Sequence, residues 1–416
     1  MPAAPSLLIV PYRSKTGKLY SQIPTSGAGD FTVTRNTEAR RFDSAGLVAS
    51  VASGIPRLDY YTSGGTAGCP ALLVEPAATN LCLQSENFST TWSPTNTVVS
   101  GNVAGTTDPA GGNTADQIFE TAASGNHFLA QTMTIVSGTT YVGSIFYKKA
   151  AGSPDWMQVA FSTTGLAGFA NFNLTSGTVG NVFAGATGRI ENYGNGWYRC
   201  TLIQTANASG TSGGPIIVFT NNTNSITRFV SYTGNTATSI YAWGAQLETG
   251  SVATSYIPTT TGTGSRSGDL VSVTGAVSGS IGQTAGTFYL DLTYSLRLTS
   301  TATRWIQIFG SSNNIGLAVA TTNIVRSIVN GQSDILSTPS TADGVKIAWG
   351  YDGSGVVCFV NGTQYTLTNG GAQIITQLNQ ISLDLSTTNA IGNCRLRAMA
   401  LYTTRLTNAE LATLTA

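Results

Sequence analysis

The chain has 416 residues, of which 20 are basic and 19 acidic, so 9% are charged and the formal net charge is +1. An ordinary soluble domain has roughly 25% charged residues. This balance excludes an electrostatic field that would recruit nucleic acid or an anionic membrane. Disorder is excluded too, because disordered chains are highly charged and poor in apolar residues, whereas this chain is 41% hydrophobic and contains 48 Gly, 41 Ser and 62 Thr.

Residues 1–85 form the first of three zones, in which short apolar runs alternate with Pro and Gly. This pattern predicts an irregular segment with few strands. Arg35, Arg40 and Arg41 are interrupted by acidic residues, which favours bidentate pairing with carboxylates of another protein over DNA binding. We therefore expect this zone to dock the protein or to hold an oligomer together.

The first residues also lack the charged and apolar regions of a secretory signal. We therefore expect assembly in a cytoplasm, where the five scattered cysteines stay reduced.

Residues 86–258 form the second zone, in which strands alternate with turn clusters, and residues 270–416 form the third. Between them, residues 259–269 have the sequence TTTGTGSRSGD and predict a flexible linker. The expected strands of the second zone are Thr140 to Lys148, Trp156 to Phe161, Gly196 to Gln204, Pro215 to Thr220 and Ser239 to Ala245.

A hairpin in the run KIAWGYDGSGVVCFVNGT is the clearest element of the third zone. Ile347, Trp349 and Tyr351 share one face of its first arm, and the residues DGSG supply the turn. This alternation predicts that Trp349 lies in a hydrophobic core.

Helix signals are scarce along the chain. At the C-terminus, Thr407 and Glu410 have the spacing of a capping box, which predicts one short helix. The fold class is therefore all-β: an irregular N-terminal docking segment, two antiparallel β-sandwich (jelly-roll) domains and a short C-terminal helix.

Three sets of residues resemble known families. The run VKIAWGYDGSGVVCFVNGT, followed by LYTTRLTNAELATL, is similar to a concanavalin A-like (laminin-G-like) sandwich over about residues 270–416. The runs SIFYKKAAG, NGWYRC and YAWGAQLETGSVATSYIPT resemble a carbohydrate-binding-like jelly roll common in bacteriophage virion proteins. The runs FTVTRNTEARRFDSAGLV, GIPRLDY and PALLVEPAATNL look like the segment that precedes such modules in phage tail-fibre proteins.

The resemblance implies a virion structural protein, such as a tail or head fibre, that is assembled in the host cytoplasm. It also implies a homotrimer that contacts other virion proteins through residues 1–85.

Acid–base chemistry needs titratable groups, and the sequence contains few. His127 is the single histidine, and no cysteine has metal-site spacing. We expect no catalytic residue, no metal and no cofactor. A capsule-degrading glycoside hydrolase stays open as an alternative, because it needs only two carboxylates roughly 5 to 9.5 Å apart. Its candidates include Asp155, Glu191, Glu248, Asp291 and Asp384.

Glycan binding needs aromatic platforms instead. Trp156, at a probable loop edge, is the best candidate for an exposed platform, and Trp197 and Tyr198 are further candidates. The expected function is a non-enzymatic virion protein that docks through its N-terminus and presents its sandwiches to a host-surface glycan. A purely architectural capsid or tail component without receptor binding is the other interpretation.

Overall fold

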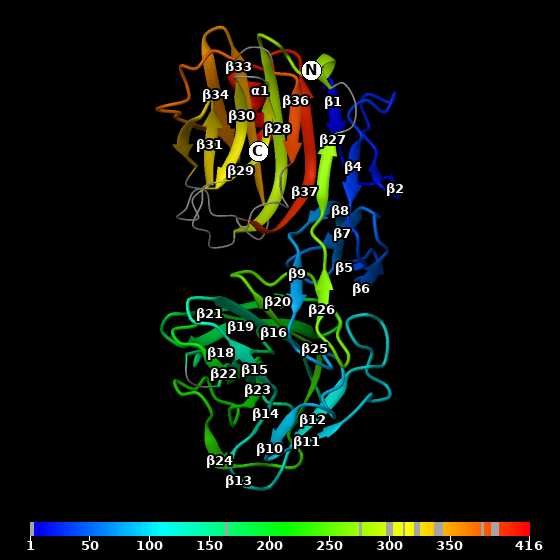
Figure 1. Cartoon of the computed structure of the whole chain (residues 1–416), viewed down its shortest axis with the longest axis vertical. Helices are drawn as coiled ribbons and strands as arrows, with labels where there is room; N and C mark the ends of the chain where they lie inside the picture. Colours follow the sequence, from blue (N-terminus) through cyan, green and yellow to red (C-terminus); the bar gives the residue numbers. More distant parts are fainter. Residues whose placement is uncertain are drawn as a thin grey trace.

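The computed structural model describes residues 4–162, 165–273, 277–296, 303–310, 313–319, 325–336, 344–375, 378–383 and 391–416. Figure 1 shows two β lobes joined by a narrower waist, with both ends of the chain in the upper lobe. We call the upper lobe the terminal sandwich and the lower lobe the middle sandwich. The waist comprises residues 35–59, 74–81 and 253–269.

The terminal sandwich consists of two large antiparallel sheets. The first has the order β35 (Thr363–Tyr365), β34 (Gly355–Val360), β33 (Val345–Asp352), β28 (Gly286–Leu296), β37 (Ile391–Tyr402), β8 (Ala67–Val74) and β7 (Arg57–Tyr61), and β1 (Leu7–Ile9) also pairs with β37. The second has the order β2 (Ser14–Lys15), β3 (Lys18–Leu19), β4 (Phe31–Thr34), β27 (Leu270–Val273), β36 (Gln380–Leu383), β29 (Thr303–Phe309), β30 (Asn314–Val319), β31 (Val325–Val329) and β32 (Gln332–Ile335).

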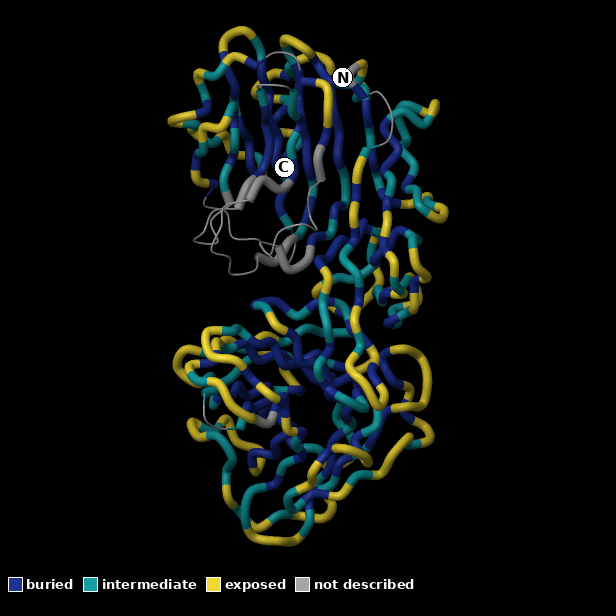
Figure 2. The backbone as a smooth tube through the Cα atoms, viewed as in Figure 1, coloured by how far each residue is buried: buried dark blue, intermediate teal, exposed yellow. Residues whose placement is uncertain are grey.

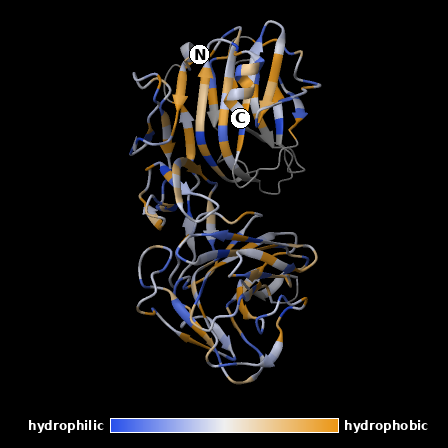
Figure 3. Cartoon of the chain, turned by 180° about the vertical axis from the view of Figure 1, so that it is seen from behind, coloured by the Kyte–Doolittle hydropathy of each residue, from blue (hydrophilic) through white to orange (hydrophobic). Residues whose placement is uncertain are grey.

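The core of this sandwich lies between the two sheets, where apolar residues of alternating strand positions meet. The hairpin β33–β34 confirms the expected alternation, because Ile347, Trp349 and Tyr351 are all at most 1% exposed. Trp349 stacks on Phe288 with ring centroids 5.4 Å apart, and its indole donates to Ser327. Figure 3 shows hydrophobic residues along the strands of this lobe, and Figure 2 shows these strands buried between exposed loops.

The first 85 residues do not stand apart as an irregular segment. They contain β1 to β9, and several of these strands complete the terminal sandwich: β1 and β8 pair with β37, and β4 pairs with β27. Leu7, Ile9 and Phe31 are fully buried in its core. The expectation of a separate docking arm is corrected, because the apolar positions of these short strands are buried against strands more than 200 residues away.

The middle sandwich packs two six-stranded sheets face to face. The distal sheet, which faces away from the waist, has the order β10 (Ser93–Thr95), β14 (Phe128–Ala130), β23 (Ile216–Phe219), β17 (Trp156–Ala160), β18 (Phe169–Asn173) and β19 (Thr178–Val182). The waist-side sheet has the order β11 (Thr97–Ser100), β12 (Asp116–Glu120), β25 (Ser239–Thr249), β16 (Thr140–Lys149), β21 (Trp197–Thr205) and β20 (Ala186–Asn192). Two small ribbons, β13 (Ser124–Asn126) with β24 (Ser231–Thr233) and β15 (Thr132–Ile135) with β22 (Gly210–Gly213), lie beside these sheets.

The central strands of the waist-side sheet are buried on both faces. Their inner face contributes to the core between the two sheets, and their outer face carries an aromatic cluster with Phe146, Trp197 and Trp243. Val48 of the hairpin β5 (Ala39–Phe42) and β6 (Val48–Val51) packs on this cluster together with Tyr256. Burial on both faces explains why β16 and β25 are almost continuously buried.

The middle sandwich is an insertion between two paired strands of the waist. β9 (Ala78–Asn80) pairs antiparallel with β26 (Gly264–Arg266), and Asn80 lies opposite Gly264. The 183 residues between them leave and return through this ribbon. Residues 259–269 are therefore not a flexible linker, since they contain a strand and the buried side chains of Arg266 and Asp269.

A helix, α1 (Asn408–Thr415), ends the chain, and with η1 (Ser278–Ser280) it makes up the helical structure of the described residues. Thr407 caps it by accepting from the backbone N–H of Glu410, while the Glu410 carboxylate accepts from the backbone N–H of Thr407. The predicted capping box is therefore confirmed. Leu411 packs on the outer face of the first terminal sheet with Tyr289 and Phe359.

Candidate functional site

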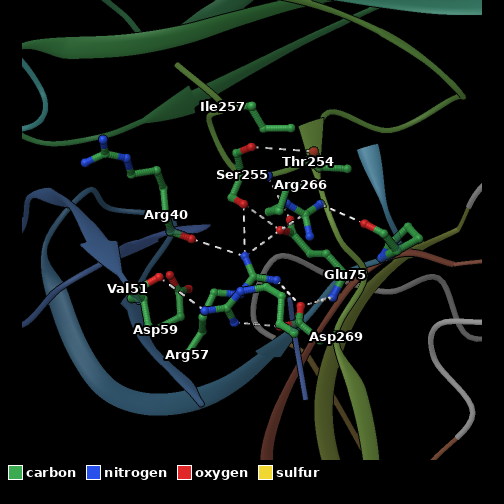
Figure 4. Close-up of polar contacts among 12 residues, drawn as sticks. Arg40, Val51, Arg57, Asp59, Glu75, Thr254, Ser255, Ile257, Arg266 and Asp269 are labelled. Carbon is green, nitrogen blue, oxygen red and sulfur yellow. Dashed lines mark hydrogen bonds and ion pairs between the residues drawn. The ribbon is translucent and has the colours of Figure 1, made fainter. Parts of the chain in front are cut away.

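The waist contains a buried cluster of charged side chains, the waist cluster, made of Arg35, Arg57, Glu75, Arg266 and Asp269 (Figure 4). Arg57 donates to a carboxylate oxygen of Glu75 at 2.7 Å and also pairs with Asp269. Asp269 accepts from Arg35 at 2.9 Å and from the backbone N–H of Glu75 at 3.0 Å. Arg266 lies 3.5 Å from Glu75. Each side chain is at most 2% exposed, so the cluster is closed to water.

Ser255 connects this cluster to the segment that leaves the middle sandwich. Its backbone N–H donates to Glu75 at 2.8 Å, its hydroxyl donates to Glu75 at 2.6 Å, and it accepts from Arg57 at 2.9 Å. On the waist-side sheet, Arg199 donates to Ser144 and to the carbonyl of Thr254, next to Ser255. Polar contacts therefore join both lobes to one centre.

The cluster sets its own ionisation. Burial by itself raises the pKa of Glu75, but Arg57 and Arg266 outweigh it and, with the Ser255 and Arg57 hydrogen bonds, hold this pKa at about 2. Burial lowers the pKa of Arg57, yet Asp269 and Glu75 raise it above its ordinary value. Carboxylates and guanidinium groups thus stay charged at neutral pH, as a buried ion cluster requires if it is to compensate for lost hydration.

A groove of about 630 Å³ lies beside the waist. Small polar residues dominate its lining, and Arg266 is its charged residue. Several of the hydroxyls already have partners: Thr79 bonds Ser265 at 2.9 Å, and Thr37 accepts from the backbone N–H of Ser267. The groove is therefore hydrophilic and free of aromatic side chains along its described lining.

Trp156 lies on the outer face of the distal sheet, and it is partly exposed. Beside it, Lys149 pairs with Asp155 and donates to Thr175 at 2.8 Å, while Thr175 also donates to Asp155. Asn222 accepts from the backbone N–H groups of Asp155 and Trp156 at 2.6 and 3.2 Å. We call these five residues the Trp156 surface.

The ionised state of this surface is fixed locally. The hydrogen bonds from Lys149 and Thr175 lower the pKa of Asp155, with a further contribution from the positive charge of Lys149. Asp155 is 44% and Lys149 35% exposed at the side chain, so both have free hydrogen-bonding capacity toward solvent.

The three predicted glycan-binding residues do not come together. Trp197 is 1% exposed on the waist-facing side of the middle sandwich, where its indole donates to the Thr107 carbonyl. It is not an exposed platform, and that prediction was wrong. Tyr198 points to the opposite face of the same strand and packs on the sandwich core. Trp156 alone occupies a surface that a ligand can reach.

The predicted docking arginines pair as their chemistry suggested, but with this chain. Arg35 forms its ion pair with Asp269 and bonds the carbonyls of the β6 end, so it is unavailable to another protein. Arg40 lies 3.5 Å from Glu38 and is partly exposed. Arg41 donates to the carbonyl of Leu58. Arg35 is thus corrected from a docking residue to an internal one.

Sequence reasoning missed Arg57, Glu75, Arg266 and Asp269. One signal was available: in a chain with 9% charged residues, Arg57 and Glu75 stand within apolar runs, IPRLDY and LLVEPAA. Charged residues in such runs are buried only when they are paired.

The remaining titratable candidates are bound up in structural contacts. Glu248 accepts from Gln246 and Thr254 in the interior of the middle sandwich. Asp291 pairs with Arg397, and Asp384 lies outside the described residues. His127 is fully buried and stacks on Tyr232 with ring centroids 4.6 Å apart.

Two structural searches complete the description of the candidate sites. Within the described ranges, no group of three or more His, Cys, Asp or Glu residues is arranged to hold a metal ion. In the same ranges, no helix has the length and apolar character needed to span a membrane.

No family model matches the sequence, and no curated protein matches it. Among solved structures, a Trypanosoma rangeli sialidase in complex with the inhibitor DANA matches with 7% identity and a TM-score of 0.28, over 97% of this chain and 63% of that chain. Domain 4 of a GH43 extracellular arabinanase from Geobacillus stearothermophilus, in complex with arabinotriose, matches with 13% identity and a TM-score of 0.28, over 36% of this chain and 73% of that domain.

A leech intramolecular trans-sialidase matches with 14% identity and a TM-score of 0.25, over 32% of this chain and 23% of that chain. The first sialidase matches span less than a quarter of the length of those proteins.

The expectation of a non-enzymatic chain does not stand against these matches, since the proteins found are sialidases and an arabinanase. The charge deficit on which it rested does not exclude a reaction that needs only two carboxylates. Because these TM-scores are low, no activity and no residue role is transferred from these enzymes to this chain.

Proposed function

We propose that the protein is a structural component of a bacteriophage virion, a tail or head fibre, that contacts a host-surface glycan through the Trp156 surface. The observation that carries the glycan part is the position of a partly exposed indole beside an exposed Lys149–Asp155–Thr175 network. An indole offers a flat apolar face to the C–H side of a sugar ring. The neighbouring ammonium and carboxylate groups offer charged donors and acceptors to sugar hydroxyls.

The position of this surface supports the same proposal. The waist-side sheet is covered by the waist, whereas Trp156 lies on the far side of the distal sheet. A glycan can therefore approach without displacing the contacts that join the lobes. The virion part is supported by the sequence resemblance.

Binding of the labelled protein to bacterial cells with different surface polysaccharides tests the glycan part. We expect saturable binding to at least one cell type and a loss of at least tenfold in affinity for Trp156→Ala. Tyr12→Ala is the matched control, because Tyr12 is an aromatic residue 59% exposed outside the Trp156 surface. Equal binding by the two variants would contradict the Trp156 surface, and absence of binding by the unaltered chain would favour a purely architectural protein.

Mass spectrometry of purified phage particles, with antibody labelling in electron micrographs, tests the virion part. We expect the chain in intact particles and the label on a fibre of the tail or head. Its absence from particles would contradict the virion proposal whatever the outcome of the binding experiment.

A further inference from the structure

A small cavity adjoins the waist cluster and has a volume of about 30 Å³. A cavity needs about 10–15 Å³ to hold one water molecule, so this one accepts a single small ion or one or two waters and excludes a polyatomic anion such as phosphate. Its wall includes Arg41, Asp59, Glu75, Glu191, Arg199 and Arg395.

Two of the carboxylates in the wall already have their partners. Asp59 accepts from the backbone N–H of Phe42 at 2.7 Å and from Arg395 at 2.5 Å. Glu75 accepts from Arg57 and Ser255 within the waist cluster. Neither carboxylate needs a cation or a water in the cavity to satisfy it.

Two arginines in the wall lack a carboxylate partner. Within the described residues, no carboxylate oxygen lies within 4.0 Å of Arg41 or Arg199. Arg199 bonds only a hydroxyl and a carbonyl among the printed contacts, at Ser144 and Thr254. The Nε–H of Arg41 is buried and has no hydrogen-bond partner in the described part of the chain.

The charges around the cavity do not balance. The waist cluster has three arginines for two carboxylates. The rest of the wall adds Arg41, Arg199 and Arg395 against Asp59 and Glu191.

Two neighbouring carboxylates complete this balance. Glu38 neutralises Arg40, which also lines the cavity, at 3.5 Å. Glu248 offsets one further charge through Thr254, to which it and Arg199 both bond. One positive charge is left beside the cavity, and a buried charge without a counter-ion is costly.

We propose that this cavity is a binding site for one small monovalent anion, chloride under cellular conditions, with Arg41 and Arg199 as its donors. The volume selects for a monatomic ion, the surplus charge selects for a single negative charge, and the unpartnered Arg41 N–H supplies a donor. The anion completes the charge balance where the two lobes meet. This inference is independent of glycan binding and of the virion role.

Anomalous diffraction from crystals soaked in bromide tests the site on the unaltered chain. We expect an anomalous peak in the cavity, within hydrogen-bonding distance of Arg41 or Arg199. An ordered water without anomalous signal at this position would overturn the proposal. Because the experiment needs no variant, its outcome does not depend on whether an altered chain folds.

Thermal denaturation in sodium chloride and in sodium gluconate at equal ionic strength provides a second test, because gluconate is too large for the cavity. We expect Tm to be higher in chloride by about 2 °C at saturating salt, and this difference to vanish in Arg41→Met. Arg405→Met is the control, since Arg405 pairs with Asp352 at a partly exposed position of the terminal sandwich. Equal Tm values of the unaltered chain in the two salts would also overturn the proposal.

Discussion

Arg57 and Asp269, 212 positions apart in the sequence, form an ion pair whose side chains are 0% and 1% exposed. Arg57 lies on β7 in one sheet of the terminal sandwich, and Asp269 immediately precedes β27 in the other. The pair therefore ties the two sheets together at the point where the middle sandwich is attached.

Asp269→Asn removes the charge but keeps the shape of the side chain. It leaves Arg57 and Arg35 buried without their shared carboxylate, and we expect the free energy of unfolding to fall by about 3–5 kcal/mol. Urea denaturation followed by tryptophan fluorescence measures this loss. The control is Asp352→Asn, whose pair with Arg405 is partly exposed and contributes about 0–1 kcal/mol. Similar losses in the two variants would show that burial of the Asp269 pair is unimportant.

Glu75 makes stability depend on acid pH. Its pKa is about 2 in the folded chain against an ordinary value of 4.5, so the unfolded state takes up a proton first as the pH falls. The stabilisation is therefore complete above about pH 4.5 and lost as the pH falls toward 2, by an amount on the order of 3 kcal/mol. Urea midpoints at pH 6, 4 and 3 measure it, with Glu75→Gln as the comparison. A constant difference between the two proteins across this range would rule out the assigned role of Glu75.

The inserted position of the middle sandwich predicts that it can be removed. Asn80 and Gly264 face each other across the β9–β26 ribbon, so residues 81–263 can be replaced by a short Asn-Gly turn without moving the flanking strands. We expect this shortened chain to give a β-type circular dichroism spectrum and a cooperative unfolding transition. The isolated fragment 270–416, which lacks β1, β4, β7 and β8, should not unfold cooperatively. A cooperative transition for that fragment would contradict the assembly of the terminal sandwich from both ends of the chain.

The proposed fibre role predicts a homotrimer. Multi-angle light scattering of the purified chain should give about three times the 43.0 kDa of one copy. A mass of one copy at micromolar concentration would count against an intertwined fibre while leaving the glycan surface untouched.

Local features of the fold could be predicted from the sequence because their partners lie close in the chain. The two arms of the β33–β34 hairpin are joined by a two-residue turn, and Thr407 and Glu410 are three positions apart. In each case, periodicity or spacing specifies the contact directly. Trp349 was assigned to the core on the same basis.

The waist could not be predicted in this way. Glu75 and Asp269 meet 194 positions apart, and strands at residues 7–9 pair with strands near residue 400. Period-two alternation gives the buried face of a strand but not the sheet to which it belongs. The same limit explains Trp197: its sequence position is compatible with an exposed platform, and only the hairpin β5–β6 folding back over it buries the indole.

The β9–β26 ribbon has a mechanical consequence. Along the chain, β8 leads into β9 and β26 leads into β27, and β8 and β27 belong to opposite sheets of the terminal sandwich. A pull on the middle sandwich, such as the drag on a particle tethered to a cell, is therefore divided between both sheets and acts along their strands. Hydrogen bonds loaded in this direction must break together rather than one after another, so the attachment should resist tension better than a single flexible tether.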